Sequence, residues 1–201
     1  MFTLVEAAGW PIWLLIIASL VAVTLIVERS LYLRSTKIAP PALLDEVVQE
    51  LKQRGVSQQM LAKLSESSPL GKVFAAGLKN IKSSPEVMKE SIEDAGRATA
   101  HELDRFLTTL GTIASISPLL GLFGTVIGMI EIFGSQNAGG AAPAELAHGI
   151  SVALYNTAFG LIVAVPSMIA YRHFRAQVGG LIFEMEQQAI RLVEIVHGER
   201  K

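Results

Sequence analysis

The sequence contains no cysteine, which excludes disulfide bonds, thiolate nucleophiles and cysteine-ligated metal centres. Aromatic residues make up only 6% of its 201 residues, and the sequence has no basic patch with interleaved aromatics that would indicate nucleic-acid binding. Lysine and arginine are absent from the first 28 residues and again from residues 106–171. Because 51% of the residues are hydrophobic and the mean hydropathy is +0.45, the composition is too apolar for an ordinary soluble protein.

Three apolar stretches are long enough to cross the hydrocarbon core of a membrane, which takes about 20 residues of helix. They cover residues 7–27, 106–130 and 146–171. The first stretch is expected to be a retained anchor and not a cleaved signal peptide, because no basic residue precedes it and its apolar run is long. The chain is therefore predicted to be an all-α membrane protein with three transmembrane helices.

Basic residues follow the first and third spans, whereas the loop between the second and third spans has none. Arg29, Arg34 and Lys37 lie after the first span, and Arg172 and Arg175 lie after the third. The positive-inside rule then places the N-terminus outside and the C-terminus in the cytoplasm. The predicted organisation is an outer end with transmembrane helix one over 1–33, a cytoplasmic helical domain over 34–105, transmembrane helix two over 106–133, an outer loop over 134–145, transmembrane helix three over 146–173 and a cytoplasmic C-terminal helix over 174–201.

The cytoplasmic segments carry helical patterns and no alternating strand pattern. Serine and proline at 67–69 and at 83–85 mark two helix starts. From Pro85 to Phe133 only Pro118 interrupts the helical pattern, so a continuous helix of roughly 70 Å is expected. The C-terminal tail has an apolar stripe, which Gly179 and Gly180 could bend. Spans two and three are thus predicted to extend into a cytoplasmic helical bundle.

Small residues gather on one face of span two and on one face of span three. Small side chains let helices approach closely in lipid, where no hydrophobic force drives them together. The residues predicted to form this helix packing are Pro118, Gly121, Gly124, Gly128, Gly149 and Gly160. Asn156 and Thr157 share the small face of span three, whereas His148, Val152 and Tyr155 are assigned to its opposite side.

Asn156 is unexpected within an apolar span, because burying an amide in hydrocarbon without a hydrogen-bond partner costs several kcal/mol of free energy. One explanation is interhelical hydrogen bonding worth about 1 kcal/mol per contact. The other is a hydrated ion path formed by Asn156 with Thr125, Thr157 and Ser151. No span carries a carboxylate or a lysine near the bilayer centre, so a partner is expected to supply any proton-transferring group.

The sequence does not indicate an enzyme, a cofactor site or a metal site. Ser151 and His148 form the single candidate nucleophile–base pair, and His148 is expected too near the membrane surface to serve. The two acidic residues between Arg105 and Arg172 are Glu131 and Glu145, and both are expected near the outer ends of their spans. No catalytic residue is therefore assigned.

Two motifs resemble the MotA/TolQ/ExbB proton-channel family: SPLLGLFGTVIGM at 117–129 and HGISVALYNTAFGLIVAVPSMIAY at 148–171. Three spans favour its ExbB/TolQ-like arm. The resemblance implies a homopentamer in a bacterial inner membrane, with its N-terminus in the periplasm, around an ExbD/TolR-like single-span partner whose transmembrane aspartate carries the ion. A TonB/TolA-like protein is a further implied partner. Ion flow would drive mechanical work on the cell envelope, as in TonB-dependent transport, with Thr125 and Thr157 facing the path.

Val152 departs from the pattern of the family, which has a glutamate at this position. Ser151 beside it is polar but does not titrate, and Asn156 is a candidate replacement ligand. The ion is therefore either a proton or sodium, since hard cations prefer oxygen donors such as those of serine, asparagine and threonine. The alternative function is a non-conducting membrane scaffold whose small faces hold a partner protein.

Overall fold

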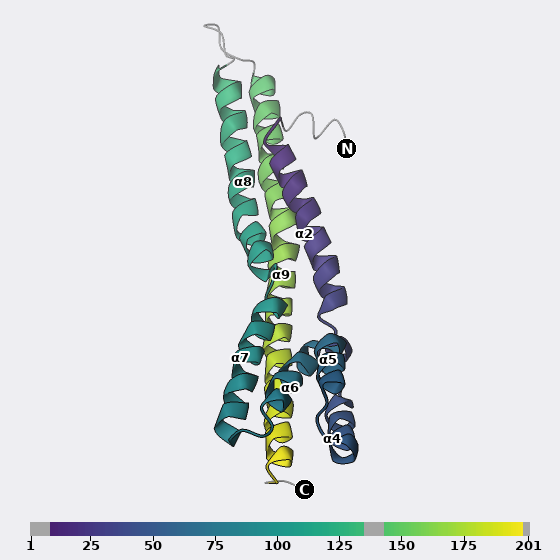
Figure 1. Cartoon of the computed structure of the whole chain (residues 1–201). Helices are drawn as coiled ribbons and strands as arrows, with labels where there is room; N and C mark the ends of the chain where they lie inside the picture. The colour runs from purple at the N-terminus through teal and green to yellow at the C-terminus, as the bar shows by residue number, and fades with distance from the viewer. Residues whose placement is uncertain (1–8, 135–142, 199–201) are drawn as a thin grey trace. The chain divides into compact units, whose positions relative to one another are not determined.

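The computed structural model describes residues 9–134 and 143–198, and these residues form helices and no strands. The helices are α2 (Ile12–Tyr32), α3 (Ser35–Ile38), α4 (Leu43–Arg54), α5 (Gln58–Ser67), α6 (Pro69–Lys79), α7 (Pro85–Leu103), α8 (Leu107–Gly134) and α9 (Pro143–Val196) (Figure 1). The predicted all-α fold is confirmed. The outer loop predicted over 134–145 lies mostly outside the described residues.

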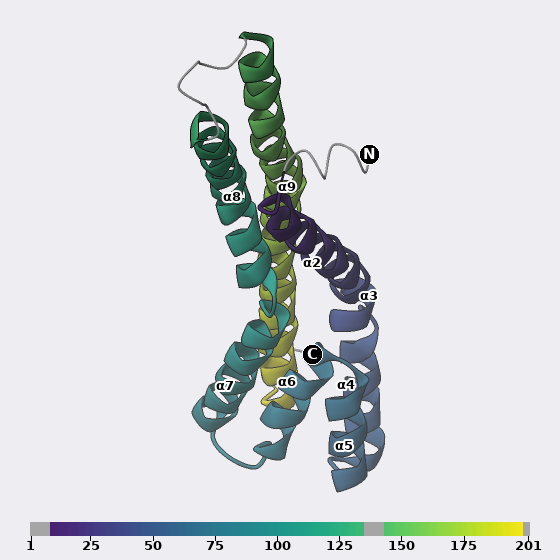
Figure 2. The same cartoon turned by 90° about the horizontal axis from the view of Figure 1, so that it is seen from above.

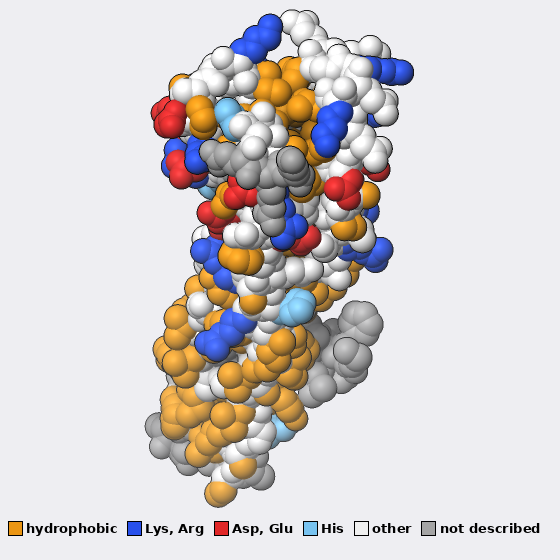
Figure 3. Space-filling view, turned by 90° about the horizontal axis from the view of Figure 1, so that it is seen from below, with side chains coloured by type: hydrophobic (Ala, Val, Ile, Leu, Met, Phe, Trp, Pro, Cys, Tyr) orange, Lys and Arg blue, Asp and Glu red, His pale blue; other side chains and the backbone are white. Residues whose placement is uncertain are grey.

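Three stretches of helix are long and apolar enough to span a membrane, as the sequence predicts. They lie within Ile12–Tyr32, Pro85–Gly134 and Leu146–Val196, with mean hydropathies of 2.2, 1.9 and 1.7 in their most apolar windows. Large apolar side chains on these stretches are exposed, among them Leu20, Leu119 and Ile162. Figure 3 shows hydrophobic side chains gathered over one part of the surface and charged side chains over another. Such an apolar surface is stable in lipid and would be unstable in water.

The chain divides into two compact units, which we call the membrane unit (residues 1–28 and 106–173) and the charged unit (residues 29–105 and 174–201). In the membrane unit, α8 lies beside the first part of α9 (Figures 1 and 2). The N-terminal part of α2 packs into this unit through Ile12 and Leu15, which are buried. The Trp10 ring meets the Phe123 ring edge-on, with 6.0 Å between ring centroids.

The charged unit has its own apolar core under a charged surface. Phe74 and Leu78 of α6, Met88 of α7 and Leu192 of α9 are fully buried. Phe74 and Leu78 are four residues apart on α6, and Leu181, Met185 and Leu192 recur at helical spacing among the buried residues of α9, so each of these helices buries one face.

Polar contacts join several elements of the charged unit. The Gln177 side-chain amide donates a hydrogen bond to the Leu33 carbonyl over 2.6 Å. Glu102 accepts hydrogen bonds from the Tyr32 hydroxyl and from the Lys72 ammonium, the latter over 2.8 Å. The Lys72 contact lowers the pKa of the Glu102 carboxyl.

The continuous helix expected from Pro85 to Phe133 is wrong, because the backbone turns at residues 104–106. α7 ends at Leu103 and α8 begins at Leu107, with Phe106 at a φ of 65° between them. A left-handed residue cannot continue a right-handed helix. Arg175 of α9 donates a hydrogen bond to the Asp104 carboxylate over 2.5 Å, which ties the end of α7 to α9. By contrast, α8 continues through Pro118, and α9 continues through Gly179 and Gly180.

Ser68→Ala is expected to lower the free energy of unfolding by about 1 kcal/mol. The Ser68 hydroxyl accepts a hydrogen bond from the buried Gly71 N–H over 3.0 Å at the start of α6. Ser57→Ala is the matched control, because the Ser57 hydroxyl caps α5 in the same way but Ser57 is exposed, so that water can replace the bond. Thermal unfolding of the full chain in detergent measures both losses, and a Ser57 loss equal to or larger than the Ser68 loss would contradict this account.

Candidate functional site

Two glycines bring the backbones of α8 and α9 close together. A methyl group added to Gly160 would lie 2.6 Å from the Ser117 carbonyl oxygen and 3.1 Å from the Gly121 Cα. One added to Gly121 would lie 2.7 Å from the Asn156 carbonyl oxygen and 3.0 Å from the Thr157 Cα. Because the obstructing atoms are backbone, the two helices can lie this close only where neither residue has a side chain.

Asn156 lies at the same interface and is 1% exposed. A methyl group added to Gly124 would lie 2.7 Å from the Asn156 Cγ, so this glycine leaves the space that the amide occupies. One turn further along α8, Gly128 faces Ala153 in the same manner. The small residues of α8 thus accommodate both the backbone of α9 and a polar side chain that lipid would exclude.

Thr125 of α8 and Thr157 of α9 form a hydroxyl pair across the interface, with 2.5 Å between their Oγ1 atoms. The Thr125 hydroxyl also lies 3.1 Å from the Ala153 carbonyl and 3.2 Å from the Gly121 carbonyl. A hydroxyl has one proton to donate and accepts through two lone pairs. When the Thr125 hydroxyl donates to a carbonyl, the Thr157 hydroxyl can donate to Thr125. Rotation of both hydroxyl groups reverses the direction of the hydrogen bond between the two threonines.

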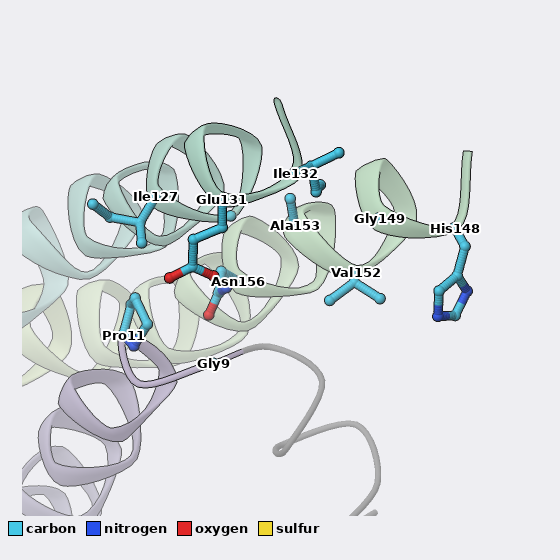
Figure 4. A pocket seen from close by; sticks show the side chains of 11 residues that line it. Gly9, Pro11, Ile127, Glu131, Ile132, His148, Gly149, Val152, Ala153 and Asn156 are labelled. Carbon is cyan, nitrogen blue, oxygen red and sulfur yellow. The ribbon is translucent and has the colours of Figure 1, made fainter. Parts of the chain in front are cut away.

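A cavity of about 370 Å³ is lined by Asn156 and extends toward the N-terminal end of α9, and neither Thr125 nor Thr157 lines it. The polar residues described in its lining are Glu131 from α8 and His148 and Asn156 from α9. Gly9 and Pro11, at the start of the described chain, close one side, and Val152 forms part of the wall. Figure 4 shows the Glu131 carboxylate directed toward Asn156, with His148 at the far edge of the cavity.

Several predicted site residues come together here and others do not. Thr125, Thr157 and Asn156 lie together. Ser151 does not join them: its side chain is exposed and its hydroxyl donates to the Ala147 carbonyl of its own helix over 2.9 Å. Among the residues predicted to pack, the five glycines lie between α8 and α9. Pro118 is half-buried within α8.

The assignment of His148 and Val152 to the side of span three away from Asn156 is wrong. Both residues line the same cavity as Asn156. The physical reason is helical spacing: Val152 and Asn156 are four residues apart, and residues at i and i+4 are neighbours on a helix surface.

The sequence predicts Glu131 only near the outer end of a span, whereas the structure places it in the site. A signal was nevertheless present, because Glu131 follows Gly124 by seven residues and Gly128 by three. Residues at these spacings share one face of a helix, so the face that contacts α9 ends in a carboxylate.

Comparison with known proteins shows which family the sequence of this chain is similar to. A family model described as the MotA/TolQ/ExbB proton channel family matches residues 65–187. The chain is 32% identical to putative biopolymer transport protein ExbB-like 3 of Synechocystis, over 79% of this chain and 77% of that protein. It is 33% identical to biopolymer transport protein exbB1 of Vibrio cholerae, over 81% and 74% of the two chains. It is 31% identical to the Tol-Pal system protein TolQ of Pseudomonas aeruginosa, over 88% and 84%.

Proposed function

The chain belongs to the MotA/TolQ/ExbB proton channel family, and from this membership we propose that it is the ExbB/TolQ-like subunit of an ion-driven motor in a bacterial inner membrane. In this proposal, protons or sodium ions move down their gradient along the interface of α8 and α9. The movement rearranges the complex and does mechanical work on the cell envelope, as in TonB-dependent transport. The resemblance of the two span motifs to this family and the three apolar helices support the proposal.

The observation that carries the proposal is the polar cluster of Thr125, Thr157 and Asn156 inside an apolar interface. The glycines alone would suffice for close packing, and each buried polar group adds a desolvation cost that packing does not require. Two hydroxyls 2.5 Å apart, beside a buried amide, offer oxygen atoms to a cation or a hydrogen-bonded relay to a proton.

A partner completes the path in this proposal. The threonine pair and Asn156 have no acid–base group of their own, and proton transfer needs a group that titrates. An ExbD/TolR-like single-span protein with a transmembrane aspartate would supply it, and a TonB/TolA-like protein would pass the work onward. Five copies of this chain would surround the partner, with the N-terminus in the periplasm and the C-terminus in the cytoplasm, as the distribution of lysine and arginine favours.

Purification of the full chain from its native membrane with whatever co-purifies tests the proposal. We expect a single-span protein with one membrane aspartate, and a native mass that fits five copies of this chain. Reconstituted into liposomes, the complex is expected to pass protons or sodium under an imposed gradient. A complex that passes neither ion, and whose cellular role survives collapse of both gradients, would instead support the non-conducting scaffold.

A further inference from the structure

Among the residues that the structure describes, the cavity between α8, α9 and the start of α2 is lined by one carboxylate, that of Glu131. We propose that Glu131 receives the cation at the outer mouth of the ion path, so that this chain carries an ion-accepting acid of its own on α8. The inference rests on the proposed function, because it assigns a step of the same ion flow. It differs in placing a titratable group in this chain in addition to the one expected from the partner.

The position of Glu131 joins the cavity to the threonine pair. Its carboxylate is directed toward Asn156 (Figure 4), and Asn156 in turn packs against Gly124, the residue before Thr125. The amide thus has the carboxylate directed toward it and packs against the residue next to Thr125. An ion that leaves Glu131 inward meets Asn156 first and the pair of Thr125 and Thr157 next.

The charges around Glu131 favour a mobile cation. None of the 11 residues that line the cavity is a lysine or an arginine. Within the described part of the chain, His148 of α9 is the other titratable residue of the lining, and it lies at the far edge of the cavity. The α2 side contributes Gly9 and Pro11. A carboxylate near lipid with no fixed cation beside it attracts one from solution. The cavity volume of about 370 Å³ leaves room for the cation with several waters.

The chemistry needs no further reactant. A proton from water on the outer side converts the Glu131 carboxylate to the neutral acid, and its departure inward restores the carboxylate. Sodium would bind the same carboxylate oxygens together with the Asn156 amide oxygen. Either cation neutralises the acid while it occupies the cavity.

A substitution at Val152 can distinguish an ion-accepting role of Glu131 from a structural role. Val152 and Glu131 line the same cavity from different helices. A carboxylate introduced at position 152 would therefore enter the same cavity from the α9 wall. If the cavity requires an acid and not Glu131 as a packing element, moving the acid across the cavity should preserve ion flow.

The experiment measures ion flux through the full chain purified with its co-purifying partner and reconstituted in liposomes, with an internal pH-sensitive dye for protons and radioactive sodium for Na⁺. Glu131→Gln is expected to lower the flux at least about tenfold, because the amide does not titrate. Glu131→Asp, and Glu131→Gln combined with Val152→Glu, are expected to retain most of the flux. Glu66→Gln removes an exposed carboxylate of α5 and is the matched control with unchanged flux. Native mass checks that every variant assembles.

Labelling with dicyclohexylcarbodiimide, which modifies carboxyl groups in apolar surroundings, gives a readout independent of flux. Peptide mass spectrometry is expected to find the label on Glu131, with protection by sodium if sodium is the ion and dependence on pH alone if it is the proton. A wild-type complex that conducts while Glu131→Gln conducts equally would overturn this inference and leave the proposed function intact. A wild-type complex that conducts neither cation would overturn both.

Discussion

Thr157→Val should lower ion flux through the assembled complex at least about tenfold, because it replaces a hydroxyl with a methyl group while keeping the branched shape of the side chain. The Thr157 and Thr125 Oγ1 atoms are 2.5 Å apart. The other hydrogen-bond partners of the Thr125 hydroxyl are the carbonyls of Ala153 and Gly121. In the variant, Thr125 keeps an acceptor for its proton but loses the partner that can donate to it or receive from it. The relay between α9 and α8 is then interrupted at one atom.

The loss should come from ion movement and not from unfolding. A hydrogen bond between helices in a membrane is worth about 0.6–2 kcal/mol, so the complex should still assemble. Thr157→Ser retains the hydroxyl and should retain most of the flux. Thr112→Val is the matched control on α8, because the Thr112 hydroxyl is exposed and donates to the Thr108 carbonyl of its own helix over 2.9 Å. Flux and native mass are measured on the same preparations.

A double variant tests whether the two threonines act as one unit. If Thr125 and Thr157 pass the ion between them, then Thr125→Val combined with Thr157→Val should conduct no less than either single variant. Groups that act together in this way show large departures from additivity. Wild-type flux in Thr157→Val would remove the hydroxyl pair from the path. Separate, multiplying losses would show that each threonine acts alone.

The sequence predicted the helices well because their signals are local. Apolar runs of about 20 residues, serine caps and first-turn prolines depend on neighbouring residues, and the structure begins α6 at Pro69 and α7 at Pro85 as expected. The contact of α8 with α9 also has a local signal, since small residues repeat at helical spacing on both. The break at residues 104–106 has none. Residues 104–106 include no glycine or proline, and the bond from Arg175 to Asp104 joins residues far apart in the chain.

Part of the candidate site was predicted because its signals are also local, and the rest was not. Thr125, Thr157 and Asn156 stand out as polar residues in apolar runs, and their types alone indicate buried polar contacts. The cavity needs three segments at once: Glu131 from α8, Val152 from α9 and Pro11 before α2. Spacing along one helix cannot reveal a wall contributed by another. The sequence thus shows a carboxylate at position 131, but it does not predict the cavity that the carboxylate lines.

Gly160→Ala should lower the free energy of unfolding by about 1–3 kcal/mol, although alanine is the better helix former. The added methyl group would lie 2.6 Å from the Ser117 carbonyl oxygen and 3.1 Å from the Gly121 Cα. These are backbone atoms, which cannot rotate away as a side chain would, so the strain can be relieved only by moving α8 and α9 apart. Gly160→Leu should enlarge the effect and prevent assembly.

Gly180→Ala on the same helix should have the opposite sign. Apart from the adjoining residues and the nearby backbone of its own helix, nothing lies within 4 Å of a methyl group added there. The substitution therefore mainly reduces the freedom of the unfolded chain, worth about 0.4–1 kcal/mol of stabilisation. Thermal unfolding of both variants in detergent separates close packing from helix propensity. Because Thr157 lies less than one turn from Gly160, moving the helices apart also separates the threonine hydroxyls, and Gly160→Ala should lose ion flux along with stability. A Gly160→Ala protein as stable as wild type would mean that α8 and α9 do not approach this closely in the membrane.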